Sequence, residues 1–137
     1  MLKKTIKYKD YDGNEREEDF YFNLKKSELL ELQVGTPGGL SQYIQKLVSE
    51  QDMPKLMDLF KKIIKCAYGV KSADGRRFEK SDELYKEFEE TEAYSELFME
   101  ISQDSNKAAA FFNGIIPAEL ANNGKDLPKG NTAPVNK

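Results

Sequence analysis

Residues 53–68 have apolar residues spaced as in a helix that is contacted on several sides. At helical spacing, the apolar residues of this stretch cover one broad arc, and charged residues fill the remaining sector. An arc this wide is typical of a central helix that is contacted by several other elements. Asp52 and Pro54 suit the start of such a helix, and Gly69 suits its end. The arc comprises Met53, Leu56, Met57, Leu59, Phe60, Ile63, Ile64, Cys66, Ala67 and Tyr68.

Residues 2–24 predict a β-hairpin at the beginning of the chain. Apolar and polar residues alternate on both sides of Asp12 and Gly13, a dipeptide that favours tight turns. Because an isolated hairpin is marginally stable in water, its apolar face must pack on helices. The residues predicted to face inward are Ile6, Tyr8, Phe20, Phe22 and Leu24.

Further helices are predicted before and after the central one. Ser81, Thr91 and either Asp104 or Ser105 are suited to cap three of them. In the helix that precedes the central one, Val48 lies on the predicted inward face. The stretch from Val70 to Phe78 is predicted to be a connector with Asp74 and Gly75 at its tip. The predicted helices span residues 23–33, 40–50, 82–90, 92–104 and 106–116.

These elements predict a mostly α, α+β fold, with the hairpin packed on a bundle of five to six helices. The 137 residues, 39% of them apolar, suit one domain, which we assign to residues 1–120. Residues 121–137 contain prolines, glycines and asparagines but few large apolar groups, so they are predicted to form a flexible tail.

Composition argues against catalysis and against a metal site. The chain has no histidine, and its one cysteine, Cys66, is best explained as a small apolar helix residue. A zinc site built on Cys and His is excluded, and the loop "GTPGGL" lacks the lysine of a phosphate-binding loop. We therefore expect no enzyme activity and no cofactor. Apolar runs are too short to span a bilayer, and no signal peptide is evident, so we expect a cytoplasmic protein without membrane contact.

Charge is strongly segregated along the chain. Residues 55–78 contain seven basic and two acidic residues, whereas residues 79–104 contain ten acidic and two basic residues. The acidic stretch would repel a phosphate backbone, so nucleic acid is not the expected partner. Opposite blocks on one chain also permit head-to-tail contacts between copies, that is, a homo-oligomer.

A dense apolar patch lies near the end of the last predicted helix. It comprises Phe111, Phe112, Ile115 and Ile116. Adjacent residues of a helix point about 100° apart, so a small bundle buries both rings with difficulty. Two interpretations remain open: plain core packing, or a partner-binding surface that is exposed when the last helix shifts. In the second interpretation, the acidic residues Glu96 and Glu100 would contribute to the same binding groove.

The order of segments from residue 3 to residue 120 resembles a known family. The hairpin with "YDGN" leads to "FNLKKSELLEL", then to the helix that ends in "AYGVKSADGRRF", to "YSELFMEI" and to "AAAFFNGIIP". This order is similar to that of the tail assembly chaperones of long-tailed phages that infect Gram-positive bacteria. None of these segments is a catalytic motif, and the resemblance assigns no role to a particular residue.

The resemblance implies a protein that binds the phage tape measure protein and keeps it soluble in the host cytoplasm. The tail-tube protein would displace it as the tube polymerises, and the mature virion would lack it. Two other functions remain compatible with the sequence: a structural component of the virion tail, and a small adaptor that binds a host protein.

Overall fold

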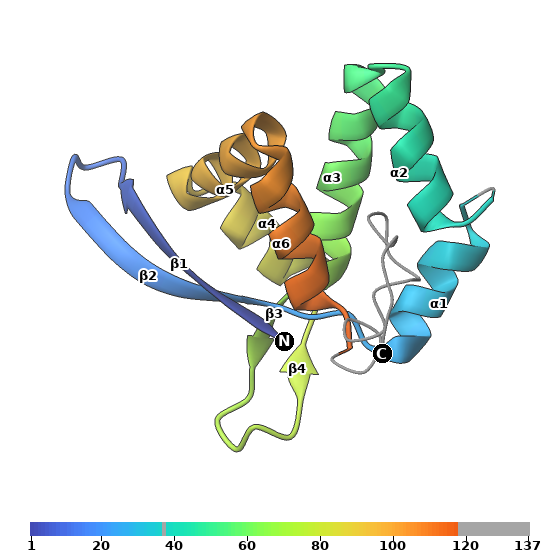
Figure 1. Cartoon of the computed structure of the whole chain (residues 1–137). Coiled ribbons are helices and arrows are strands. Elements are labelled where there is room, and N and C mark those ends of the chain that lie inside the picture. The colour runs from blue at the N-terminus through green and yellow to red at the C-terminus, as the bar shows by residue number, and fades with distance from the viewer. Residues whose placement is uncertain (37, 118–137) are drawn as a thin grey trace.

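The computed structural model describes residues 1–36 and 38–117, and it combines one antiparallel sheet with a set of helices (Figure 1). This arrangement confirms the predicted mostly α, α+β fold with an N-terminal hairpin packed on helices. The tail predicted at residues 121–137 lies outside the described residues. In chain order the elements are β1 (Leu2–Lys9), β2 (Glu15–Phe22), α1 (Lys26–Val34), α2 (Leu40–Ser49), α3 (Met53–Ala67), β3 (Tyr68–Lys71), β4 (Phe78–Glu79), α4 (Asp82–Glu89), α5 (Glu92–Gln103) and α6 (Ser105–Ile115).

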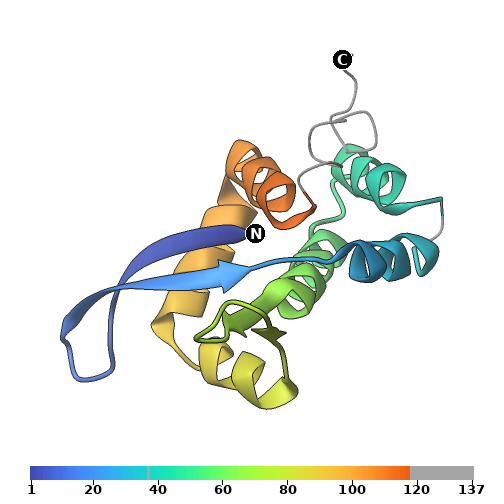
Figure 2. The same cartoon turned by 90° about the horizontal axis from the view of Figure 1, so that it is seen from below.

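The β1–β2 hairpin has the predicted turn. Leu2 lies opposite Phe22, and Gly13 adopts a φ of 86°, which the turn requires. The Asp10 carboxylate accepts hydrogen bonds from the backbone N–H groups of Asp12 and Asn14 and from Arg16. The bond from Arg16 is the main reason why the pKa of Asp10 is lowered. These contacts fix the turn, and the inner face of the hairpin packs on α5 (Figure 2).

The segment after α3 differs from the prediction. It forms a second hairpin, β3–β4, and β3 pairs with β2 so that Phe22 lies opposite Tyr68. The predicted turn at Asp74 and Gly75 is present, but the strands on both sides of it were not predicted, and α3 ends at Ala67 rather than continuing through Tyr68. Strands of four and two residues are too short to show a clear alternation, and pairing with a strand far away in the sequence overrides local preference.

The helix starts follow the sequence closely. Asp52, Ser81 and Thr91 each accept a hydrogen bond from a backbone N–H in the first turn of their helix, as predicted. At the start of α6, Asp104 and not Ser105 is the cap, and its carboxylate accepts two such bonds. Capping depends on residues within one turn, which explains why the sequence predicts it well.

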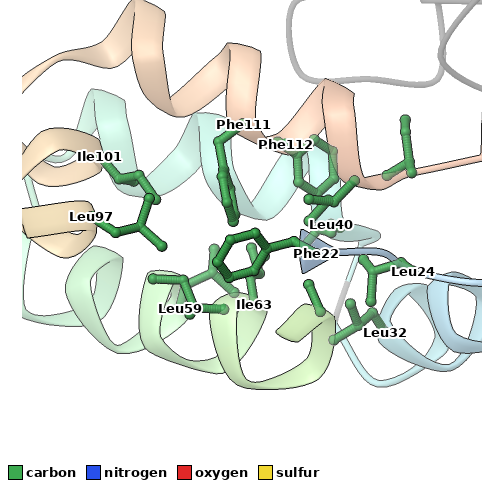
Figure 3. Close-up of a cluster of buried hydrophobic side chains, with 14 of the residues drawn as sticks. Phe22, Leu24, Leu32, Leu40, Leu59, Ile63, Leu97, Ile101, Phe111 and Phe112 are labelled. Carbon is green, nitrogen blue, oxygen red and sulfur yellow. The ribbon is translucent and has the colours of Figure 1, made fainter. Parts of the chain in front are cut away.

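Phe22 lies at the centre of the core. Its side chain is fully buried, and its ring centroid lies 5.2 Å from that of Phe111, 5.7 Å from Tyr68 and 5.8 Å from Phe88. Figure 3 shows Phe22 between Phe111 of α6 and residues of α3, among them Ile63. One residue of β2 thus joins the sheet, the central helix and the last helix in a single apolar cluster.

Polar contacts join the same parts of the chain. The backbone N–H of Leu24 donates to the carbonyl of Ile115 at 2.7 Å, so the segment after β2 is tied to the end of α6. The ammonium group of Lys80 donates to the carbonyls of Asn23 and Cys66 and to both carboxylate oxygens of Glu28. This half-buried ammonium therefore links the second hairpin to α1 and to the end of α3.

Gly69 allows the second hairpin to pack closely, and its replacement by alanine is expected to destabilise the fold. A Cβ atom at this position would lie 2.6 Å from the Phe78 ring and 2.8 Å from the carbonyl oxygen of Glu79. We expect Gly69→Ala to lower the free energy of unfolding by about 1–3 kcal/mol, as overpacking usually does. Urea denaturation followed by circular dichroism measures this change. Gly75→Ala serves as a comparison without steric overlap, because no atom lies within 4 Å of its Cβ position. Any loss of stability there reports only the backbone strain of an alanine at a φ of 76°.

Candidate functional site

An apolar groove runs between two pairs of helices, α2 with α3 and α5 with α6. It encloses about 760 Å³. Figure 1 shows α2 and α3 side by side and apart from α5 and α6. All four helices contribute residues to the groove. Residues that line it include Ile44, Val48, Met53, Phe60, Ala109 and Phe112.

The groove is electrically neutral. None of the residues that line it is charged, although charged residues make up 33% of the chain. Its two outer walls, α2 and α6, contain one charged residue each, Lys46 and Lys107, and neither lines the groove. Depletion of charge is typical of the buried centre of a protein–protein interface.

Large apolar side chains stand exposed along the α2–α3 wall. Val48 is 57% exposed and Met53 is 43% exposed, and both line the groove. Met57, one turn further along α3, is 37% exposed. The sequence predicted that all three face inward, and this prediction is wrong because no described part of the chain covers that side. An apolar wall left open in this way is available to a partner.

The opposite wall, on α6, includes small residues next to Phe111 and Phe112. The three consecutive alanines Ala108–Ala110 leave room for another helix to approach closely. Within the part of the chain that the structure describes, α6 contacts α5 and β1, while Ala109 and Ala110 remain exposed and Ala108 and Ala109 border the groove. A further helix could therefore approach the α6 backbone from inside the groove.

Ser102 adds an unsatisfied polar group to the groove. Its hydroxyl oxygen is buried and has no hydrogen-bond partner among the described residues. A buried hydroxyl without a partner is costly, so such groups are rare in folded proteins. Because Ser102 also lines the groove, a bound molecule with a polar group could supply the missing bond after a rotation of the serine side chain.

The six residues predicted to bind a partner occupy three different places. Phe111 and Phe112 line the groove, although both rings are at least nine-tenths buried. Ile115 and Ile116 lie deeper in the core and do not line the groove. Neither acidic residue lines it: Glu96 is exposed, and Glu100 forms an ion pair with Lys4 of β1 at 2.6 Å. The role of the six residues in partner binding stays a prediction.

Sequence reasoning missed the α2–α3 side of the groove. Val48, Met53 and Phe60 were assigned to the core because their spacing fits an inward face. A second signal was available: residues 40–49 and 105–115 each contain a single charged residue, whereas the helices between them are rich in charge. Two nearly uncharged helices in a highly charged chain indicate surfaces that are buried, either by the chain itself or by a partner.

The described residues offer little for chemistry. No group of three or more potential metal ligands occurs among them, and burial raises the pKa of the Cys66 thiol, which disfavours the reactive thiolate. A second hollow lies beside the β3–β4 turn, but the hydrogen bonds of Lys80 already link its walls.

Comparison with known proteins gives one result. The family model described as "Phage tail assembly chaperone" matches residues 1–136. No curated protein and no solved structure matches the chain. In the described part of the chain, no helix is long and apolar enough to cross a membrane. The family match extends over nearly the whole sequence, and the chain therefore belongs to the phage tail assembly chaperones.

Proposed function

We propose that this chaperone holds an amphipathic helix of the tape measure protein in the groove between α2–α3 and α5–α6. The observation that carries the proposal is the neutral, apolar groove, which has exposed large side chains on one wall and alanines on the other. Membership of the tail assembly chaperones supports a client among the tail proteins. Long helical proteins with apolar stripes need such cover before they assemble.

A helix is the form of client that the groove fits best. The α3 residues that line the groove run from Met53 to Ile64, a helix length of about 17 Å. A helix with apolar residues at positions i, i+3, i+4, i+7 and i+11 presents a stripe of about that length and seats it in a groove, a common mode of recognition. Val48 and Met53 would contact the large residues of the stripe, while Ala108 and Ala109 allow the backbones to approach. Each large apolar side chain that is buried contributes about 1.5–3 kcal/mol.

Met53 suits the groove to a client with varied sequence. Met53 lines the groove and is 43% exposed, and its flexible side chain adapts to differently shaped partners. The unpaired Ser102 hydroxyl lies at the other side of the groove and would bond to a polar side chain within an otherwise apolar stripe. Such a surface accepts several segments of a long client.

The later steps of tail assembly belong to the same proposal. The chaperone acts by binding alone, in the host cytoplasm, and helps to recruit tail-tube subunits, which displace it as the tube grows. It is then absent from the mature virion. A structural component of the tail would instead remain in purified particles, and an adaptor for a host protein would bind its partner without any tail protein.

Co-expression with the tape measure protein of the same phage tests the proposal. We expect the client to remain in the soluble fraction only when the chaperone is present, and the two to purify together. Because the groove is neutral, raising the salt concentration from about 0.1 M to about 1 M should weaken the complex little. A complex that dissociates in high salt would assign binding to the charged stretches instead. An insoluble client in the presence of folded chaperone would contradict the proposal.

A further inference from the structure

The strand β1 is an open edge of the sheet. The strand order is β1-β2-β3-β4, so β1 has a neighbour on one side only (Figure 2). It is eight residues long, whereas β4, at the other edge, has two. Long edge strands offer a row of backbone N–H and C=O groups to any extended chain that fits them.

The turn defines which backbone groups of β1 face outward. The backbone N–H of Asp10 donates to the carbonyl of Asn14 at 2.9 Å, so this pair is a hydrogen-bonded one. In an antiparallel ladder, hydrogen-bonded and non-hydrogen-bonded pairs alternate. Lys9 opposite Glu15 is then non-hydrogen-bonded, and the same holds for every second residue before Lys9.

The pairing of β2 with β3 leads independently to the same alternation of hydrogen-bonded pairs in β1–β2. The backbone N–H of Asn23 donates to Ala67 at 2.8 Å, so Tyr21 forms its ladder bonds with Gly69 of β3. The bonds of its neighbour Phe22 then point to Leu2 of β1. Both ends of the ladder agree that four residues of β1 direct their N–H and C=O groups away from β2. They are Lys3, Thr5, Lys7 and Lys9.

These outward positions coincide with the lysines of the strand. The side chains of Lys3, Lys7 and Lys9 are exposed and form no ion pair among the described residues. Their outward backbone N–H and C=O groups form no hydrogen bond with any described backbone group. On the inner side of the strand, Lys4 pairs with Glu100 instead. The edge therefore combines open hydrogen-bonding groups with a row of unpaired positive charges.

The charge row decides which strands can bind. A second copy of β1 would bring lysines close to lysines, and like charges on paired strands repel each other. On its other side, β1 already accepts an acidic strand, with Glu15, Glu17 and Asp19 of β2 opposite Lys9, Lys7 and Thr5. A strand with carboxylates at alternate positions would find the same complementarity on the open side.

We propose that the open edge of β1 binds an extended, acidic segment of a partner protein by strand addition. Backbone hydrogen bonds to residues 3, 5, 7 and 9 supply the common part of the interaction, and the three lysines select the acidic partner. This surface is separate from the groove, so one chaperone could hold a helical client and a second protein at the same time. The inference does not depend on the identity of the helical client.

Amide hydrogen exchange with a synthetic peptide tests this inference on the full chain. The probe is an eight-residue peptide in which glutamate alternates with threonine, and its counterpart has lysine in place of glutamate. We expect the acidic peptide to slow exchange of the amides of Lys3, Thr5, Lys7 and Lys9 while leaving the amides between them unchanged. The lysine peptide should have no effect. Equal protection by both peptides, or none by the acidic one, would overturn the proposal.

Two substitutions at one position separate the hydrogen bonds from the charge. Lys7→Pro removes the outward N–H, which an edge strand tolerates, and should abolish protection by the acidic peptide. Lys7→Thr keeps the N–H and should retain part of the affinity. Should Lys7→Pro fail to fold, the triple variant Lys3→Thr, Lys7→Thr, Lys9→Thr decides, because it should bind the acidic peptide about tenfold more weakly. Unchanged affinity in the triple variant would refute selection by charge.

Discussion

Replacing Phe22 with alanine is expected to lower the free energy of unfolding by about 4 kcal/mol. The ring is fully buried and contacts Tyr68, Phe88 and Phe111, so its removal leaves a cavity bordered by three elements. Domains of this size are stable by about 5–15 kcal/mol, so the loss removes a large part of the total. Urea denaturation followed by circular dichroism measures it.

Tyr21 provides the matched control on the same strand. It precedes Phe22, points to the other face of the sheet and is only half-buried. Tyr21→Ala should therefore cost about 1 kcal/mol or less. If Phe22→Ala also costs less than about 1 kcal/mol, the core does not close around this ring as described.

Replacing Val48 with aspartate is expected to abolish capture of a helical client without unfolding the chaperone. Val48 is 57% exposed, so the free protein tolerates a charge there. In the complex, the same carboxylate would be buried in a groove that offers no positive charge, and its short side chain cannot reach water. We expect affinity for the tape measure protein to fall by about a hundredfold, which corresponds to an unpaired buried polar group of about 3 kcal/mol. Co-purification and calorimetry with a client segment measure the loss.

Ser49→Asp is the control for Val48→Asp. It adds the same charge to the next residue of α2, which is exposed and does not line the groove. Its affinity for the client should stay within about twofold of the wild type. Equal losses in the two variants would mean that added negative charge, rather than the groove, governs binding. Phe112, in contrast, is 8% exposed, so its replacement would disturb the core together with the groove.

Local features made much of the fold predictable. The turn at Asp12 and Gly13 and the caps Asp52, Ser81 and Thr91 act through neighbours within one turn, and the structure has them where the sequence indicated. The second hairpin was not predictable in this way. Its strand β3 exists because Tyr68 and Gly69 pair with β2, and no pattern within four residues reports a partner so far away.

The candidate site shows a different limit of sequence reasoning. Periodicity indicates which face of a helix is apolar, but it does not show whether the chain itself covers that face. Val48 and Met53 have the spacing of core residues and yet stand exposed. Phe111 and Phe112, which looked too crowded for one core, are both buried because α6 lies across Phe22 and the core beneath it. Whether the apolar face of a helix is covered depends on how the other helices and strands pack against it.

The hydrogen bond between Leu24 and Ile115 joins an early segment of the chain to a late one, which affects folding during translation. The core around Phe22 cannot close until α6 has been synthesised, because Phe111 supplies one of its walls. Until then, Phe22 and the aromatic residues already synthesised lack the cover that α6 provides. A chaperone that covers apolar surfaces of other proteins must therefore itself pass through a stage in which its own apolar core is exposed to water.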